Sequence, residues 1–127
     1  MGRLMSEKGY SPDLILSSPA LRARTTAELV KDAGRLSAEI RLDERIYEAS
    51  PMALLEIIAG IDGSVNSVMI VGHNPGMETF IRLLSGRIEA MPTAALAVLE
   101  LGMERWADTC EECGIVRAIY RPKELED

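Results

Sequence analysis

The chain has 127 residues, of which 47% are hydrophobic, and its formal net charge is −6. This length predicts one domain, residues 1–127, with a core that needs no disulfide or metal. The acidic balance would repel a polyphosphate backbone, so we expect no nucleic-acid partner. The sequence shows neither an apolar run near the ~20 residues of a membrane span nor a hydrophobic signal core at its start, so we expect no membrane association. Together with only two cysteines, this predicts a cytoplasmic protein.

Short apolar runs alternate with longer amphipathic stretches along the chain, which predicts an α/β fold. Residues 14–17 indicate a buried strand. The following Ser18-Pro19 predicts an N-cap with a proline at the first helical position, and the helix should continue to about Asp32. Residues 39–42 indicate an edge strand.

The second half of the chain continues the alternation. Ser50-Pro51 repeats the cap-and-proline signal ahead of another helix. The apolar run 67–71 predicts a strand covered on both faces, as in a parallel sheet. Residues 77–84 indicate a helix, and residues 93–101 and 114–120 indicate two strands that could pair antiparallel at a sheet edge.

Polar residues gather where the predicted strands end, which is where open α/β sheets bind ligands. Arg22 lies one turn after Ser18, and its guanidinium can fork onto phosphate oxygens beside helix N-terminal amides. The alternative interpretation is a solvated helix with an ordinary capping serine and surface arginines.

His73 is the only histidine in the chain and follows the apolar run 67–71 within Gly-His-Asn-Pro-Gly. It can donate to a bound anion or shuttle a proton near neutral pH. A structural histidine that hydrogen-bonds within a turn is the alternative. Glu48 precedes the second cap and would act as a general acid if it reached the same rim, although most glutamates are merely solvated.

Several motifs follow one another in order along almost the whole chain: Leu-Ser-Ser-Pro-Ala-Leu-Arg-Ala-Arg-Thr-Thr-Ala, Tyr-Glu-Ala-Ser-Pro, Val-Gly-His-Asn-Pro-Gly, Pro-Thr-Ala-Ala-Leu-Ala-Val-Leu-Glu and Arg-Pro-Lys-Glu-Leu. Together they resemble the SixA-type phosphohistidine phosphatases of the histidine phosphatase superfamily. The resemblance implies a three-layer α/β/α fold with a mostly parallel sheet. It also implies hydrolysis of phosphohistidine, or of another phosphomonoester, through a phosphohistidine intermediate without a cofactor or metal ion.

The resemblance also assigns roles to individual residues. Arg22 matches the arginine that clamps phosphate, and His73 matches the second active-site histidine, which stabilises the transferring phosphoryl group. Glu48 matches the acid that protonates the leaving group. We therefore predict His73 and Glu48 as catalytic residues, and we predict that phosphate is bound by Arg22, Ser18, His73 and Asn74.

One feature of the family is missing from this sequence. Family members attack phosphorus with a first histidine in an Arg-His-Gly or Arg-His-Ala motif at the end of their first strand, and the chain contains no such motif. Residues 2–10 resemble the helix that follows this strand, so we expect an N-terminally incomplete domain without the first, central strand. We expect weak or no turnover. Without this strand, we expect the remaining strands to pair with each other, the chain to form a homodimer through the exposed sheet edge, or the fragment to be poorly stable.

Other functions stay open at this point. His73 as a substitute nucleophile would need an in-line geometry that a second-position histidine is not built to supply. A non-catalytic module that binds phosphate is the stronger alternative. The expected partner in every case is a phosphorylated protein, such as a histidine phosphotransfer domain, or a small phosphate ester.

The motif Cys110-Glu111-Glu112-Cys113 has the spacing of redox and metal sites. Its acidic neighbours should raise the pKa values of the thiols, which disfavours a reactive thiolate. Two cysteines without a nearby histidine also fall short of four zinc ligands. The sequence therefore favours structural or incidental cysteines here.

Overall fold

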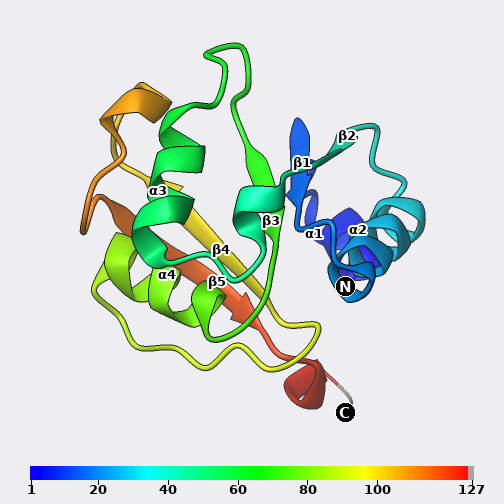
Figure 1. The fold of residues 1–127 in the computed structure, drawn as a ribbon. Helices are drawn as coiled ribbons and strands as arrows, with labels where there is room; N and C mark the ends of the chain where they lie inside the picture. Colours follow the sequence, from blue (N-terminus) through cyan, green and yellow to red (C-terminus); the bar gives the residue numbers. More distant parts are fainter. Residues whose placement is uncertain (126–127) are drawn as a thin grey trace. The chain divides into compact units, whose positions relative to one another are not determined.

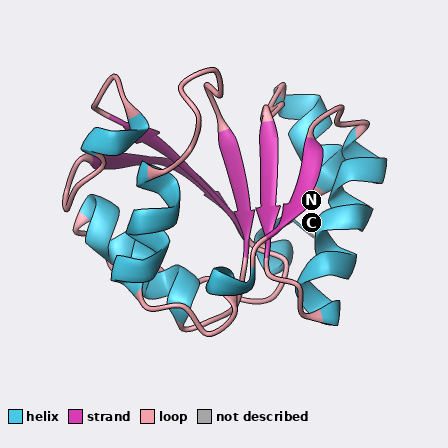
Figure 2. Ribbon diagram, turned by 45° about the horizontal axis from the view of Figure 1, so that its top comes forward, coloured by secondary structure: helices cyan, strands magenta, loops and turns pink. Residues whose placement is uncertain are grey.

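The computed structural model describes residues 1–125, which gather into two compact units. The first unit comprises Met1–Glu48 and Asp62–His73, and the second comprises Ala49–Ile61 and the described part of Asn74–Asp127. Both units contain helices and strands (Figures 1 and 2), so the expected α/β class is confirmed. No helix within residues 1–125 combines the length and apolarity needed to cross a membrane.

The first unit is organised around a three-stranded parallel sheet in the order β2-β1-β3. The strands expected at residues 14–17 and 39–42 have these bounds, and β2 lies at an edge as predicted. The elements of this unit are α1 (Gly2–Lys8), β1 (Leu14–Ser17), α2 (Leu21–Gly34), β2 (Glu39–Leu42), the 3₁₀ helix η1 (Glu44–Ile46) and β3 (Val68–Val71).

The strands β1 and β3 differ in burial. All four residues of β1 are buried, because this strand has a neighbour on each side and α2 packs against it. Each residue of β3 is only half-buried, so the expectation of a strand fully covered on both faces was wrong. The physical reason is its position, because β3 has one strand neighbour in this sheet and forms its second edge.

A close backbone contact joins α1 to α2, which lie side by side (Figure 1). A Cβ atom added to Gly2 would lie 2.6 Å from the carbonyl oxygen of Val30 and 2.8 Å from the amide nitrogen of Gly34. A Cβ atom on Gly34 would in turn lie 3.0 Å from the carbonyl oxygen of Gly2. Two glycines therefore allow the helix backbones to approach more closely than any side chain would permit.

The second unit combines two helices with an antiparallel pair of strands. Its elements are α3 (Pro51–Ala59), α4 (Gly76–Ser85), β4 (Leu96–Leu101), the 3₁₀ helix η2 (Trp106–Asp108), β5 (Gly114–Tyr120) and the 3₁₀ helix η3 (Pro122–Leu125). The hydroxyl of Ser50 accepts a hydrogen bond from the amide of Ala53 at 3.1 Å, which confirms the predicted cap of α3. The expected antiparallel pairing of the last two strands is also confirmed, and α4 packs against β5.

The strand β4 begins at Leu96, whereas the sequence predicted a start at Thr93. Ala94 has a φ of 67°, and the amide of Ala95 donates to the carbonyl of Pro92, so a turn occupies these positions. A left-handed residue cannot belong to a regular strand. The alternating pattern of the sequence did not reveal this break.

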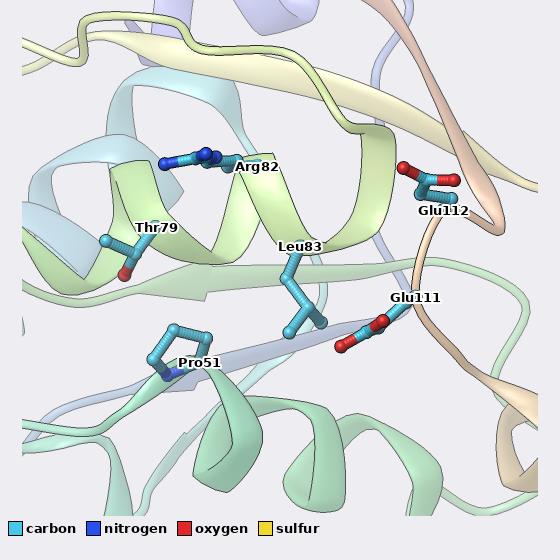
Figure 3. Close-up of a pocket in the computed structure, with 6 residues that line it drawn as sticks. All are labelled: Pro51, Thr79, Arg82, Leu83, Glu111 and Glu112. Atoms are coloured by element: carbon cyan, nitrogen blue, oxygen red, sulfur yellow. The ribbon is translucent and has the colours of Figure 1, made fainter.

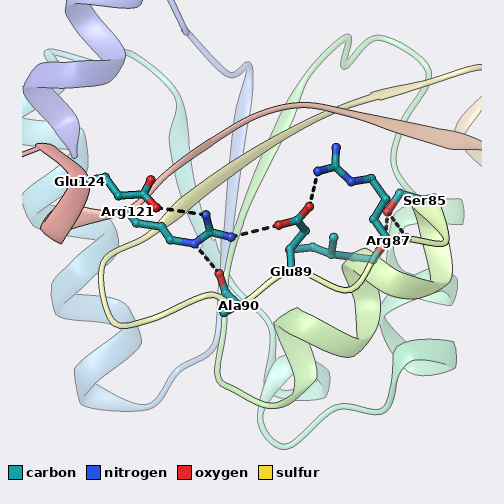
Figure 4. Close-up of polar contacts among 7 residues, drawn as sticks. Ser85, Arg87, Glu89, Ala90, Arg121 and Glu124 are labelled. Atoms are coloured by element: carbon teal, nitrogen blue, oxygen red, sulfur yellow. Dashed lines mark hydrogen bonds and ion pairs between the residues drawn. The ribbon is translucent and has the colours of Figure 1, made fainter.

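The segment between α4 and β4 is fastened to the end of β5 by an arginine (Figure 4). Arg121 donates to the carbonyl of Ala90 at 2.9 Å and pairs with Glu89 at 3.1 Å and with Glu124 at 3.4 Å. Glu89 also forms an ion pair with Arg87. Only a quarter of the Arg121 side chain is exposed, so these contacts are screened less than ordinary surface pairs.

We predict that Gly2→Ala destabilises the protein by about 1–3 kcal/mol, because the new methyl group forces α1 away from α2. Helix propensity alone would give the opposite sign, since alanine favours a helix over glycine by roughly 0.5–1 kcal/mol. Denaturant unfolding measures the change. The matched control is Gly63→Ala, whose Cβ would meet no atom within 4 Å. Equal stability of the two variants would contradict the close helix contact.

Candidate functional site

The candidate site of the first unit lies at the carboxyl ends of β1 and β3. The two strands pair in parallel with Ser17 opposite Val71, and the amide of Ser18 extends the ladder by donating to the carbonyl of Val71 at 3.0 Å. His73 follows two residues after the end of β3. The pairing therefore brings Ser18 and His73, which are 55 positions apart in the sequence, to the same edge of the sheet.

A hydrogen bond of 2.8 Å joins Nε2 of His73 to Oγ of Ser18. The Ser18 side chain is fully buried, and its Oγ also accepts from the amide of Ala20 at 3.3 Å. Ser17 is equally buried and donates its hydroxyl to the carbonyl of Ser18 at 2.9 Å. The imidazole of His73 is thus held by a serine that cannot move without breaking buried hydrogen bonds.

The start of α2 differs from the prediction that Ser18 caps it. The helix begins at Leu21, its N-cap is Ala20, and no side chain caps it. The reason is that the Ser18 hydroxyl serves His73 and the Ala20 amide instead. The first turn of a 14-residue helix is therefore left without a side-chain cap, and its N–H groups carry partial positive charge suited to an anion.

Arg22 is the second residue of α2, and its side chain is exposed. Its guanidinium forms no ion pair or hydrogen bond with the residues that the structure describes, whereas its carbonyl accepts from the hydroxyl of Thr26 at 3.0 Å. A guanidinium without a carboxylate partner keeps its five donors available for an oxyanion. Arg22, which the sequence singled out, is therefore a cation that has no partner among the described residues and lies near the start of a helix.

Tyr47 and Glu48 follow η1, which Asp43 caps. The carboxylate of Asp43 accepts from the amide of Arg45 at 2.9 Å and forms an ion pair with its guanidinium at 2.6 Å. The hydrogen bond from the Arg45 side chain lowers the pKa of Asp43, although desolvation opposes this shift. Asp43 therefore stays ionised, and its cap fixes the turn that leads to Tyr47.

The ring of Tyr47 lies edge-on to the ring of His73, with 5.6 Å between centroids and 86° between planes. This geometry is favourable for two aromatic rings. Glu48 has a φ of 51° and an exposed side chain, and it makes no hydrogen bond or ion pair within residues 1–125. Sequence reasoning missed Tyr47, and the only signal for it was its place beside Glu48 in Tyr-Glu-Ala-Ser-Pro.

Asn74 belongs to the second unit. Its side-chain amide donates to the carbonyl of Met91, and the amide of Met91 donates to the carboxylate of Glu78 at 2.7 Å. Asn74, just before α4, and Glu78, in the first turn of α4, therefore bind the two backbone groups of Met91. In this structure the Asn74 nitrogen anchors the segment before β4.

A hollow of about 360 Å³ lies within the second unit (Figure 3). It is lined by Pro51, Thr79, Arg82, Leu83, Glu111 and Glu112. These residues include none of the predicted site residues. Within residues 1–125, no three His, Cys, Asp or Glu side chains gather in a way that could hold a metal ion.

The first unit is an α/β unit with a parallel sheet, a histidine just beyond one strand end, and an arginine that has no partner within residues 1–125. An uncharacterized protein of Mycobacterium tuberculosis, Rv1276c, is 31% identical over 122 residues, with 87% of this chain and 74% of that protein covered. No family model matches the sequence.

Solved structures of similar proteins indicate the family to which this α/β protein belongs. The crystal structure of an Agrobacterium tumefaciens protein assigned as the phosphohistidine phosphatase SixA superposes with a TM-score of 0.78 and 30% identity, covering 95% of this chain and 75% of that one. The tungstate complex of the protein histidine phosphatase SixA shares the fold, with a TM-score of 0.80 and 21% identity, covering 98% of this chain and 81% of that one. The chain belongs to the SixA phosphohistidine phosphatase family of the histidine phosphatase superfamily.

We predict that Ser18→Ala lowers the free energy of unfolding by about 1–2 kcal/mol and shifts the imidazole resonances of His73, because the ring loses its buried partner. His73 is the only histidine, so its resonances in an NMR spectrum are unambiguous. Ser17→Ala is the matched control, since Ser17 is as buried but bonds only to a neighbouring carbonyl. If both variants moved the His73 resonances equally, the assigned hydrogen bond would be incorrect.

Proposed function

We propose that the chain binds the phosphoryl group of a phosphohistidine protein, or of a small phosphate ester, at a site formed by Arg22, Ser18 and His73. The observation that carries this proposal is the hydrogen bond between His73 and Ser18 at the ends of two paired strands. This bond fixes the imidazole of His73. The same unit contains the start of α2, which no side chain caps, and Arg22, which has no carboxylate partner among the described residues.

Electrostatics supports an oxyanion as the ligand. The partial positive charge of the α2 N-terminus and the full charge of Arg22 both favour a dianion. The solved SixA protein that binds tungstate supports the same ligand class, because tungstate is an oxyanion like phosphate. Phosphohistidine is the substrate class suggested by the activity for which the related solved proteins are named.

In this proposal His73 stabilises the transferring phosphoryl group and does not attack it. Attack needs a ring nitrogen whose lone pair is directed at phosphorus, and one of the two nitrogens of His73, Nε2, faces Ser18 at 2.8 Å instead. The family's nucleophile is a first histidine that this sequence does not contain. We propose that a chain that also carries that residue forms its phosphohistidine intermediate on it, with Glu48 protonating the leaving group, and that the present chain turns over weakly or not at all.

A second candidate function rests on the same observation. A chain that holds phosphate through Arg22 and His73 without a nucleophile would act as a binding module for phosphorylated protein. A histidine phosphotransfer domain is the proposed class of protein partner, and no cofactor is needed. A cytoplasmic location and a homodimer through the free edge of β3 are also part of this proposal.

We predict that Arg22→Ala weakens phosphate or tungstate binding by about tenfold to hundredfold, the value of a charge-assisted hydrogen bond. Isothermal titration calorimetry at millimolar anion measures the loss. Arg24→Ala is the matched control, because Arg24 is exposed on the same helix and its removal changes the net charge equally. Equal losses for both variants would show general attraction to positive charge and would contradict a site at Arg22.

The second test measures turnover of an aryl phosphate and of a phosphohistidine protein. It compares this chain with a longer chain that adds the family's first strand and its Arg-His motif at the N-terminus. We predict activity for the extended chain alone, and a loss of that activity when His73→Asn is introduced. Activity of the unextended chain that disappears with His73→Asn would make His73 the nucleophile and overturn the proposed role. Binding of phosphate by both chains without turnover by either would favour the binding module.

A further inference from the structure

Cys110 and Cys113 flank a turn formed by Glu111 and Glu112 between β4 and β5. The backbone amide of Cys110 donates to Sγ of Cys113 at 3.4 Å, so the second sulfur lies against the backbone of the first cysteine. A turn keeps its first and fourth Cα atoms within about 7 Å. Disulfides need a Cα separation of about 4.4–6.8 Å. A turn of this kind thus brings its first and fourth Cα atoms to about the separation that a disulfide needs.

Two backbone hydrogen bonds hold the turn, one at its centre and one at Cys113. The amide of Glu112 donates to the carbonyl of Leu83 at the end of α4, at 2.9 Å. The amide of Gly102 donates to the carbonyl of Cys113 at 2.7 Å. Glu112 itself has a φ of 56°, a left-handed conformation that the turn imposes. A bond between the two sulfurs would require side-chain rotation and little movement of the backbone.

Both cysteines are free thiols, and they differ in access to solvent. Cys110 is exposed and Cys113 is half-buried. An external oxidant would therefore meet Cys110 first, and Cys113 would lie beside it as the second thiol. This order of access is the arrangement that closes an intramolecular disulfide through a mixed disulfide.

We propose that Cys110 and Cys113 form a reversible intramolecular disulfide in exchange with a small disulfide such as oxidised glutathione. Cys110 loses its proton and attacks one glutathione sulfur, which breaks the glutathione disulfide and releases one thiolate. Cys113 then loses its proton and attacks the Cys110 sulfur, which releases the second thiolate. The two protons neutralise the two thiolates, so the protein dithiol is oxidised by two electrons and the oxidant is reduced to two thiols.

The surroundings of Cys110 make this disulfide slow to form and hard to reduce. Desolvation, the hydrogen bond with Cys113 and the charges of Asp108 and Glu111 raise the pKa of Cys110, as the acidic sequence led us to expect. A thiol of raised pKa is a poor attacking group near neutral pH and a poor leaving group when its disulfide is attacked. The pair therefore exchanges slowly in both directions.

Closure of the disulfide would also act on the hollow of the second unit. Glu111 and Glu112, the residues between the two cysteines, line that hollow together with Arg82 (Figure 3). The short ring that the disulfide closes would restrict the backbone that carries both carboxylates. Oxidation would thus fix one wall of the hollow.

The test incubates the reduced full chain with excess oxidised glutathione and measures its intact mass and its alkylation by N-ethylmaleimide. We expect a loss equal to two hydrogen atoms, no alkylation, and recovery of both thiols after dithiothreitol. Cys113→Ser is expected to retain one glutathione on Cys110, because the second thiol that would displace it is absent. Two thiols that stay alkylatable, a stable glutathione adduct of the natural chain or a disulfide between chains would each overturn the proposal.

The thermal midpoint of the oxidised and reduced chains provides a second measurement. A disulfide that fits the turn restricts the unfolded chain and should raise the midpoint modestly, because the closed loop is short. Slower hydrogen exchange at the amide of Glu112 should accompany it. A lower midpoint on oxidation would show that the turn does not hold the sulfurs in bonding geometry and would overturn the proposal.

Discussion

The parallel pairing of β1 with β3 determines where the candidate site residues Ser18 and His73 lie in the first unit. The register that places Ser17 opposite Val71 also places Ser18 beside the residues that follow β3, and His73 reaches the Ser18 hydroxyl from there. A slip by one residue would turn the side chains of either strand to the opposite face. The site therefore depends on a register that four fully buried residues of β1 stabilise.

The uncapped start of α2 is a consequence of the same contact. Serine in a Ser-Pro sequence would ordinarily cap the helix that follows, and Ser50 does so for α3. Ser18 instead binds His73 and the amide of Ala20, so α2 begins without a side-chain cap. One hydrogen bond thus orients the imidazole and leaves helix amides available to an anion. It also explains why two similar motifs in one chain have different roles.

Local sequence patterns predicted the elements whose ends carry strong signals. The strands at residues 14–17, 39–42 and 114–120 were predicted with their observed bounds, because glycine, proline or charged residues delimit short apolar runs. The role of Ser18 was not predictable in this way, since its partner is 55 positions away. The half-burial of β3 depends on which strands neighbour it, and the left-handed residue of the turn is Ala94, at a position that no glycine or asparagine marks in the sequence.

Arg22 and His73 are candidates from the sequence, and the structure adds the setting of each side chain. The sequence singled them out by motif, whereas the structure shows a guanidinium without a partner in residues 1–125 and an imidazole held in place. The placement of Tyr47 against His73 adds a contact that only the fold could reveal. Membership in the SixA family places these features in a group of proteins named for phosphohistidine chemistry.

We propose that one oxyanion is bound by the start of α2 and by His73 together. The decisive experiment is a titration of the isotopically labelled chain with phosphate, followed by NMR. We expect the amide signals of Leu21, Arg22 and Ala23 and the imidazole signals of His73 to shift together with one common affinity. Shifts confined to the residues around the hollow of the second unit, or no saturable shift at all, would contradict it.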